Sequence, residues 1–247
     1  MTDRLLATLR TDADRLVELA GGDLSVPVPT CPGWSLGDLL VHLGRVHRWA
    51  AVAATTPPGD DWPRFGERPA AGVQIGPWLR AGLDQLDVLF DTPDLDLPAW
   101  TFIGPGTARW WLRRQTLETA MHRWDAQVAA KATLDPIDAA TAAEGIDEWC
   151  QLESARWFRP SDEAAMTVHL HATDTAGDAD ELPAEWFLEA DTTELRWSHG
   201  HHKGDIAVRA GRAELWLAIW RRLPLSEVEV LGDPARLEDF LLASAVD

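Results

Sequence analysis

The sequence predicts an α+β protein in which a four-helix bundle precedes a small α+β domain. Up to about residue 158, apolar residues recur at the three- and four-residue spacing of helices, and proline- and glycine-containing loops separate these segments. From residue 166 on, short segments alternate between apolar and polar residues, as half-buried strands do. The 247 residues are enough to bury one large or two small cores. We therefore expect a helical bundle at residues 1–158 and an α+β domain at residues 159–247.

Four amphipathic segments define the expected bundle. They are residues 2–22, 36–54, 77–92 and 107–130. Gly21 and Gly22 end the first, and Ser35 is an N-cap for the second, with Asp38 as its capping-box partner. Pro77 suits the first turn of the third. Because long irregular loops join these helices, a bundle is the simplest arrangement that buries their apolar faces.

The remaining segments predict a linking helix and a mixed second domain. The linking helix is residues 135–157. The expected strands are residues 166–174, 185–191, 194–200 and 205–211. A helix at 212–223, a short strand at 226–233 and a closing helix at 234–245 complete the pattern. Strands followed by helices in this order are typical of an α+β domain.

Composition excludes several classes of partner. The net charge of -18 repels nucleic-acid phosphates and anionic membranes, so we expect neither as a partner. Cys31 and Cys150 make no CxxC motif and no disulfide framework. The first 22 residues are charged throughout, unlike a signal peptide, and no apolar run reaches the roughly 20 residues of a membrane span. We expect a cytoplasmic protein, and the sequence does not predict its oligomeric state.

The stretch ETAMHRWD, residues 118–125, carries an acid and an imidazole on one helix face. Glu118 and His122 are four residues apart, so their side chains point the same way beside an apolar stripe. Burying either group without a partner is costly. By spacing alone, a helical hydrogen bond of about 0.2–0.5 kcal/mol is the simpler interpretation.

A histidine on the second helix offers an alternative. His42 lies on the apolar stripe of that helix, where a lone histidine is more often a hydrogen-bonded core residue than a ligand. Two bundle helices can nevertheless project side chains into one core. His42, Glu118 and His122 would then supply two nitrogens and one oxygen, as in open zinc sites and in non-haem Fe(II) sites. His47, about 140° further round the helix, is expected at the surface or behind the ligands.

Three neighbouring residues have two interpretations each. Asp125 either holds a ligand imidazole or pairs in solvent with Arg123 or another cation. Arg114 either anchors a substrate carboxylate or pairs with Glu118, and we favour the ion pair. Cys31 is either a reactive or ligating thiol or, as we prefer, a small packed residue.

The sequence contains the segments VPTCPGWSLGDLLVHLGRVHRW and RRQTLETAMHRWDAQVA. These two segments resemble the mycothiol-dependent maleylpyruvate isomerase family, the DinB-like group of actinobacterial proteins. The family pattern is a proline–tryptophan loop, a helix with a metal histidine and a helix bearing E-x-x-x-H-x-x-D. It is matched by Pro32, Gly33, Trp34, His42, Glu118, His122 and Asp125. The later VLGDPARLEDFLL resembles the end of the family's C-terminal domain.

The resemblance implies a DinB-like bundle with a divalent ion, usually zinc, on His42, Glu118 and His122. Mycothiol would take the open position as cofactor or co-substrate, and a coordinated thiol loses its proton. In the family isomerase, the thiolate adds to a cis double bond of a small electrophile; rotation and elimination leave the trans isomer. Other DinB-like proteins resemble thiol S-transferases. A metal- or ligand-binding module without turnover is a further alternative.

The family is thought to use an arginine of its C-terminal domain for carboxylates of substrate or cofactor. The candidates are Arg209, Arg212, Arg221 and Arg222. We take Arg221 and Arg222, together with Asp125, as the catalytic candidates. Both arginines also end a helix, where cations complement the helix dipole.

The second domain contains further histidines. HGHHKGD, residues 199–205, offers three histidines that could bind a metal, although a turn between strands explains them at least as well. His169 and His171 share one strand face, which is either the solvent side or part of a ligand pocket.

Overall fold

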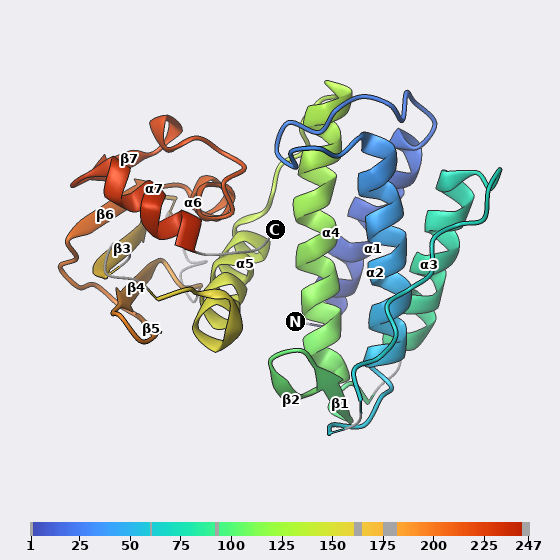
Figure 1. Ribbon diagram of the computed structural model, residues 1–247, viewed down its shortest axis with the longest axis horizontal. Coiled ribbons are helices and arrows are strands. Elements are labelled where there is room, and N and C mark those ends of the chain that lie inside the picture. The colour runs from blue at the N-terminus through green and yellow to red at the C-terminus, as the bar shows by residue number, and fades with distance from the viewer. Residues whose placement is uncertain (1, 60, 92–93, 161–164, 175–181, 244–247) are drawn as a thin grey trace. The chain divides into compact units, whose positions relative to one another are not determined.

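The computed structural model (Figure 1) describes residues 2–59, 61–91, 94–160, 165–174 and 182–243. The chain forms two compact units, Met1–Pro136 and Ile137–Asp247. The first unit is mainly helical and the second contains a five-stranded sheet with helices, so the predicted α+β class is confirmed.

The first unit is a bundle of four helices that lie side by side (Figure 1). They are α1 (Thr2–Leu19), α2 (Leu36–Ala53), α3 (Ile75–Phe90) and α4 (Ala108–Ala130). The predicted capping box is present, because the Ser35 side chain accepts from the backbone of Asp38 and the Asp38 side chain accepts from that of Ser35. The four predicted helices are thus confirmed, with ends that shift by a few residues.

A short hairpin corrects the expectation that the loop before α4 is irregular. Strands β1 (Pro98–Thr101) and β2 (Gly104–Thr107) pair antiparallel. Gly104 has a φ of 123°, which a residue with a side chain rarely adopts, and Trp100 is buried. The sequence of the hairpin shows little alternation of apolar and polar residues. The hairpin forms because β1 packs onto the bundle through buried residues such as Trp100.

Tryptophans fill one end of the bundle core. Trp111 is fully buried and donates its indole N–H to the carbonyl oxygen of Trp100 at 2.6 Å. The Trp49 ring lies 5.1 Å from that of Trp111 and 6.0 Å from that of Trp100. Such rings each bury a large apolar area, so they hold α2, α4 and the hairpin together.

Helix α4 is also tied to α1 by a buried polar link. Arg123 is 2% exposed and donates to Asp12 at 2.9 Å and to Gln127 at 2.8 Å. A buried guanidinium that lost these acceptors would be strongly destabilising. The link therefore fixes which face of α4 meets α1, and so where the opposite side chains of α4 point.

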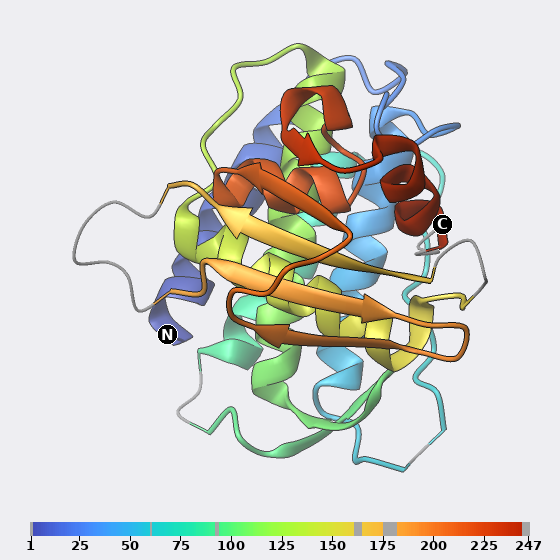
Figure 2. The same cartoon turned by 90° about the vertical axis from the view of Figure 1, so that its left-hand side faces the viewer.

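The second unit begins with helix α5 (Ala139–Leu152) and a single π-helical turn (Glu153–Trp157). Its sheet consists of β3 (Met166–Ala172), β4 (Glu185–Ala190), β5 (Leu195–His199), β6 (Ile206–Ala210) and β7 (Glu229–Leu231). The strand order is β5-β4-β3-β6-β7, and only the β3–β6 pair is parallel among these strands (Figure 2). Helices α6 (Arg212–Ile219) and α7 (Pro234–Ala243) and a 3-10 turn (Leu225–Glu227) complete the unit.

The two faces of this sheet differ in chemistry. Val168, Leu170 and Leu188 face a small apolar cavity that residues of α6 and α7 also line. Successive side chains of a strand point to opposite faces, so His169 and His171 lie on the other face. Figure 2 looks onto the strands, with α5 of the same unit behind them. The alternation that predicted these strands therefore also places His169 and His171 on the face opposite the cavity.

Several predicted ends in this unit differ from the observed ones. The helix predicted at 135–157 begins at Ala139, because Asp138 caps it, and ends in the π turn. The helix predicted at 212–223 ends at Ile219, since the backbone of Arg221 is left-handed, with a φ of 59°. Residues 244 and 245 of the predicted closing helix lie outside the described residues.

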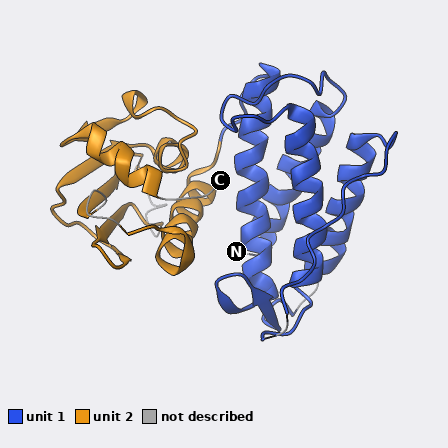
Figure 3. Ribbon diagram, in the orientation of Figure 1, with its two compact units in different colours: residues 1–136 blue, residues 137–247 orange. Residues whose placement is uncertain are grey.

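The division of the chain differs from the predicted boundary between residues 158 and 159. Helix α5 belongs to the second compact unit (Figure 3), because it packs closely against α6. Gly145 of α5 lies so near the Trp216 indole that a Cβ atom there would be 2.2 Å from a ring carbon. None of the helices in the described part of the chain is long and apolar enough to cross a membrane.

A close approach of α2 and α3 gives a test of the bundle. A Cβ atom on Gly44 would lie 2.1 Å from a carbon of the Trp78 ring, so Gly44→Ala forces the ring or the helix to move. We expect the free energy of unfolding to fall by about 1–3 kcal/mol, as for other overpacked cores. Urea unfolding followed by circular dichroism measures it.

Gly76→Ala is the matched control for this substitution. Gly76 is also a buried helical glycine, but an added Cβ there would lie 3.4 Å from the Cβ atom of Ala20, an ordinary contact. It should leave stability unchanged or raise it by up to about 1 kcal/mol through helix propensity. Equal effects of the two substitutions would contradict the close packing of α2 on α3.

Candidate metal centre

The structure brings His42, Glu118 and His122 together between α2 and α4. The His42 Nε2 atom lies 3.1 Å from Oε1 of Glu118, and the His122 Nε2 atom lies 3.3 Å from the same oxygen. The two imidazole rings are 5.3 Å apart and meet nearly edge to face. The three residues that the sequence singled out thus share one cluster, with their donor atoms within 4.8 Å of one another.

The donor atoms of this cluster fit a small divalent ion. Zinc binds imidazole nitrogen and carboxylate oxygen at about 2.0–2.2 Å in a tetrahedron, whose edges are therefore about 3.3 Å long. The separations of 3.1 and 3.3 Å from Glu118 Oε1 to the two Nε2 atoms match such edges. Three protein donors leave the fourth corner of the tetrahedron for another ligand.

Asp125 orients the imidazole of His122. The His122 Nδ1 atom donates to Asp125 Oδ2 at 2.9 Å, which leaves Nε2 turned toward Glu118. Asp125 is fully buried, and its carboxylate also accepts from the Thr30 hydroxyl at 2.6 Å and from the Cys31 thiol at 3.5 Å. The alternative of a solvated acid is wrong for Asp125, since burial removes it from water. Carboxylates hold metal-binding histidines in the same way.

The loop before α2 supplies two hydrogen-bond donors to Asp125. The sequence did not indicate the first, Thr30, and we expected the second, Cys31, to be a packed residue. Thr30 gave no signal in the sequence, because a hydroxyl 95 positions from its acceptor has no spacing pattern. Cys31 is partly buried, and its thiol, with His122 and Asp125, makes a second group of donors adjoining the first. The loop therefore closes over the Asp125 side of the cluster.

Arg114 pairs with the other oxygen of Glu118, as we expected. Its guanidinium donates to Oε2, so Oε1 is left to face the two histidines. Burial alone would raise the pKa of Glu118, but Arg114 and then His122 and His42 outweigh it and lower that pKa well below its usual value. Glu118 is therefore ionised at neutral pH despite its burial.

His122 responds to the same charges in the opposite direction. Burial alone would lower its pKa, but Glu118, followed by Asp125 and Cys31, raises the pKa well above its usual value. The metal-free cluster thus pairs a carboxylate with an imidazolium. A cation that binds Nε2 of His122 must displace one proton, as is general for metal sites.

His42 forms the accessible side of the cluster. Its side chain is 28% exposed, whereas those of Glu118 and His122 are 12% and 9% exposed. The Trp34 ring lies 4.9 Å from the His42 ring and belongs to the proline–tryptophan loop. A small molecule would reach the donor atoms from this side, next to Trp34.

His47 is fully buried, which excludes the first of its two expected positions, the surface, and leaves the position behind the ligands. Its Nε2 atom is 3.0 Å from the Thr119 hydroxyl, on the residue after Glu118. Burial lowers the pKa of His47 to about 3, so the ring is neutral. His47 follows Leu43 by four residues and precedes Ala50 by three. This helical spacing puts it on the apolar stripe of α2 and could have predicted its burial.

The candidate arginines of the second unit have varied surroundings. Arg212 is buried, donating to the Pro183 carbonyl at 3.0 Å and to Asp174 at 3.1 Å, and Arg209 pairs with Glu229 at 2.9 Å. These contacts do not test whether either arginine binds carboxylates, so both stay candidates. The Arg222 guanidinium donates to the carbonyl of Trp220 at 2.9 Å, and Arg221 is exposed. A catalytic role for Arg221 and Arg222 stays a prediction.

The fold and the cluster together define the class of protein, a helical bundle with a candidate mononuclear metal site, joined to a small α+β unit. Residues 6–127 match the family model of the mycothiol maleylpyruvate isomerase N-terminal domain. The predicted resemblance is therefore confirmed, and this part of the chain belongs to that domain family.

Solved structures agree with this assignment at the level of the fold. The chain is similar to the crystal structure of the mycothiol-dependent maleylpyruvate isomerase, with a TM-score of 0.58, 15% identity and 88% of each chain covered. A histidine-to-alanine mutant of that enzyme gives a TM-score of 0.57 at 13% identity, again with 88% of each chain covered. A comparison with curated proteins gave no match.

The bond between His122 and Asp125 predicts a graded loss of metal affinity. Asp125→Asn keeps the size of the side chain but removes the charge that holds Nδ1–H, so zinc should bind about 10- to 100-fold more weakly. Competition with a chromophoric chelator measures the affinity. Asp87→Asn removes a charge from a side chain of α3 that pairs with Arg10 outside this cluster, and should leave zinc affinity unchanged. An equal loss in both variants would contradict the orienting role.

Burial of His47 predicts acid sensitivity. Its pKa is about 3 when folded. An unfolded histidine has a pKa of about 6.5, so between these values only the unfolded state binds the proton. The contribution of His47 to stability is then complete above about pH 6.5 and falls toward pH 3 by roughly 1.4 kcal/mol per pH unit.

Urea unfolding of EDTA-treated protein at two pH values tests this dependence. Between about pH 7.5 and about pH 5, the wild-type chain should lose roughly 2 kcal/mol more than His47→Gln does. The comparison between pH values cancels the cost of the substitution itself. Parallel pH profiles for the two chains would show that His47 is not the group responsible.

Proposed function

We propose that the protein is a divalent-metal- and mycothiol-dependent enzyme that acts on a small electrophile by cis–trans isomerisation, as a maleylpyruvate isomerase does. The observation that carries this proposal is the convergence of two imidazole nitrogens and one carboxylate oxygen from α2 and α4. That convergence occurs in a domain whose family is named for such an isomerase.

His42, Glu118 and His122 would hold the ion, and zinc suits a set of two nitrogens and one oxygen with an open fourth position. A divalent ion there would lower the pKa of a thiol bound to it and thereby supply a thiolate at neutral pH. Mycothiol is the thiol that the family name suggests.

The surrounding residues of the chain prepare the site for this role. Asp125 keeps the proton of His122 on Nδ1, so the lone pair of Nε2 is available to a cation once its proton leaves. Arg114 holds Oε2 of Glu118 and presents Oε1 as a single donor. Because Glu118 and His122 are largely buried and His42 is not, thiol and electrophile would approach along the His42 side, beside Trp34.

An anionic substrate needs a cationic partner on a chain whose net charge is -18. We propose that Arg221 or Arg222 binds substrate or thiol carboxylates, since a guanidinium pairs with a carboxylate through two parallel hydrogen bonds. Replacing each by lysine keeps the charge and removes that geometry. A raised KM with little change in kcat would support a binding role.

Metal content and activity test the proposal together. His42→Ala and Glu118→Ala should each lose one equivalent of zinc per chain relative to wild type, and activity should fall by more than about 100-fold. The assay supplies zinc, mycothiol and maleylpyruvate and follows the trans isomer by chromatography. His199→Gln, which removes a histidine outside this cluster, is the control and should retain both zinc and activity.

Each other outcome has a meaning. Full zinc retention in His42→Ala and Glu118→Ala would show that the ligand assignment is wrong. Accumulation of a thioether in place of the trans isomer would indicate a mycothiol S-transferase. Thiol binding without any product would indicate a metal- and ligand-binding module.

A further inference from the structure

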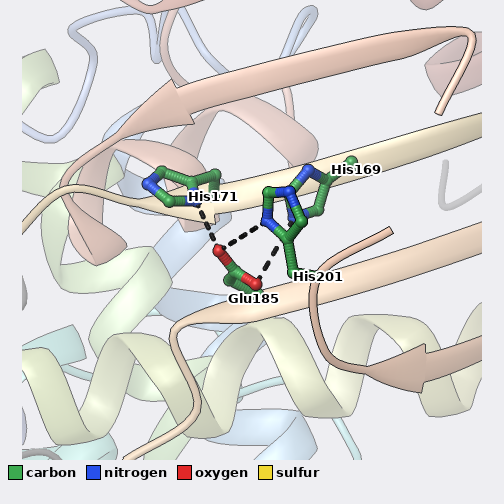
Figure 4. Close-up of side chains that lie close together, drawn as sticks. All are labelled: His169, His171, Glu185 and His201. Carbon is green, nitrogen blue, oxygen red and sulfur yellow. Dashed lines mark hydrogen bonds and ion pairs between the residues drawn. The ribbon is translucent and has the colours of Figure 1, made fainter. Parts of the chain in front are cut away.

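Three histidines and a glutamate of the second unit form another cluster (Figure 4). His169 and His171 come from β3, Glu185 from β4 and His201 from the segment between β5 and β6. Their donor atoms lie within 4.8 Å of one another. The cluster lies outside residues 6–127, which match the family model, so the domain family does not account for it.

Strand geometry explains how three of these residues meet. His169 and His171 are two positions apart on β3 and so share a face. Glu185 is the residue directly opposite His171 in the antiparallel register, and directly opposite residues share a face. The face is the one turned away from the apolar cavity.

The sheet order brings in His201. Strand β5 is an edge strand beside β4, whereas β6 pairs with β3, so the connection between β5 and β6 must cross β4 and β3. Asp205 pins the end of this crossover, accepting from the backbone of Thr167 at 2.9 Å. A Cβ atom on Gly204 would lie 3.1 Å from the His169 backbone nitrogen, so the crossover lies directly on β3.

The distances within the cluster resemble those of a coordination shell. The Nδ1 atoms of His171 and His201 lie 2.7 and 3.0 Å from Oε1 of Glu185. The His169 and His201 rings are 4.8 Å apart and perpendicular, and Figure 4 shows all three rings around the carboxylate. The two N···O separations lie somewhat below the edge of about 3.3 Å of a zinc tetrahedron, so these donors are near enough to share one ion.

His169 is the residue that hydrogen bonding leaves unexplained. It is 5% exposed, and its Nε2 atom has no hydrogen-bond partner among the described residues. That atom lies 3.9 Å from Oε2 of Glu185, too far for a hydrogen bond but turned toward the cluster. Burial lowers the pKa of His169, which favours the neutral imidazole. A buried polar atom without a partner is costly, and a cation at the centre of the cluster would satisfy it.

We propose that His169, His171, Glu185 and His201 form a second metal site, which binds a divalent transition-metal ion such as zinc. Three imidazoles favour zinc and its neighbours over calcium or magnesium, which prefer oxygen ligands. Four protein donors complete a tetrahedron, so the site is structural and not catalytic. Its role is to fasten the crossover to the sheet, since His201 is otherwise 74% exposed.

Untagged full-length protein provides the test, because a histidine tag would itself bind the ion. His42→Ala with His122→Gln removes the first site together with the adjoining group of Cys31, His122 and Asp125, and the chain is then dialysed against zinc and analysed for metal. We expect one zinc per chain in this background. Adding His171→Gln and His201→Gln should abolish that zinc, whereas adding His202→Gln, in the same segment but outside the cluster, should not.

A second measurement separates metal loss from misfolding. Cobalt gives strong visible absorption when bound tetrahedrally, and this band should appear in the background chain and disappear with His169→Gln, while circular dichroism stays unchanged. No bound zinc in the background chain would overturn the proposal and leave a hydrogen-bonded carboxylate–histidine cluster. Zinc that persists after loss of His171 and His201 would overturn it too. Neither result depends on the proposed enzymatic activity.

Discussion

Glu118 places a carboxylate inside the helical unit, where loss of hydration penalises a charge. Its ionised form persists because Arg114 holds one oxygen while His42 and His122 face the other. Removing any one of these partners would leave the remaining charges poorly compensated. At the cluster, α2 and α4 are therefore held together by the contact between His42 and Glu118. Elsewhere apolar packing, such as that of Trp49 on Trp111, holds the two helices together.

The surrounding bundle makes this arrangement rigid. Arg123 and Asp12 lock α4 onto α1, and the tryptophans around Trp111 lock it onto α2 and the hairpin. The loop before α2 adds Thr30 behind Asp125. Glu118 and His122 thus each have a partner behind the donor atom, Arg114 and Asp125, as sites that hold a metal in fixed geometry require.

The two clusters use the same chemistry on different scaffolds. In the bundle, a helical spacing of four residues and a second helix supply three donors and leave an accessible side at His42. In the sheet, a strand spacing of two residues and a crossover supply four donors. An open set suits a reacting ligand, whereas a closed set suits a fastening role. This difference is why we assign the proposed reaction to the bundle.

The sequence by itself determined the helices of the bundle, the strands beyond residue 165 and the trio of His42, Glu118 and His122. Periodicity and capping are local properties. The resemblance to the family motif was what grouped His42 with Glu118 and His122, which are far away in the sequence. Tertiary structure decided the features that do not depend on local spacing. It buried Asp125 and paired Arg123 of α4 with Asp12 of α1. It also brought His201 next to His169, because the strand order sends the connection between β5 and β6 across the sheet. Strand order follows from packing of the whole unit and not from any short stretch of residues.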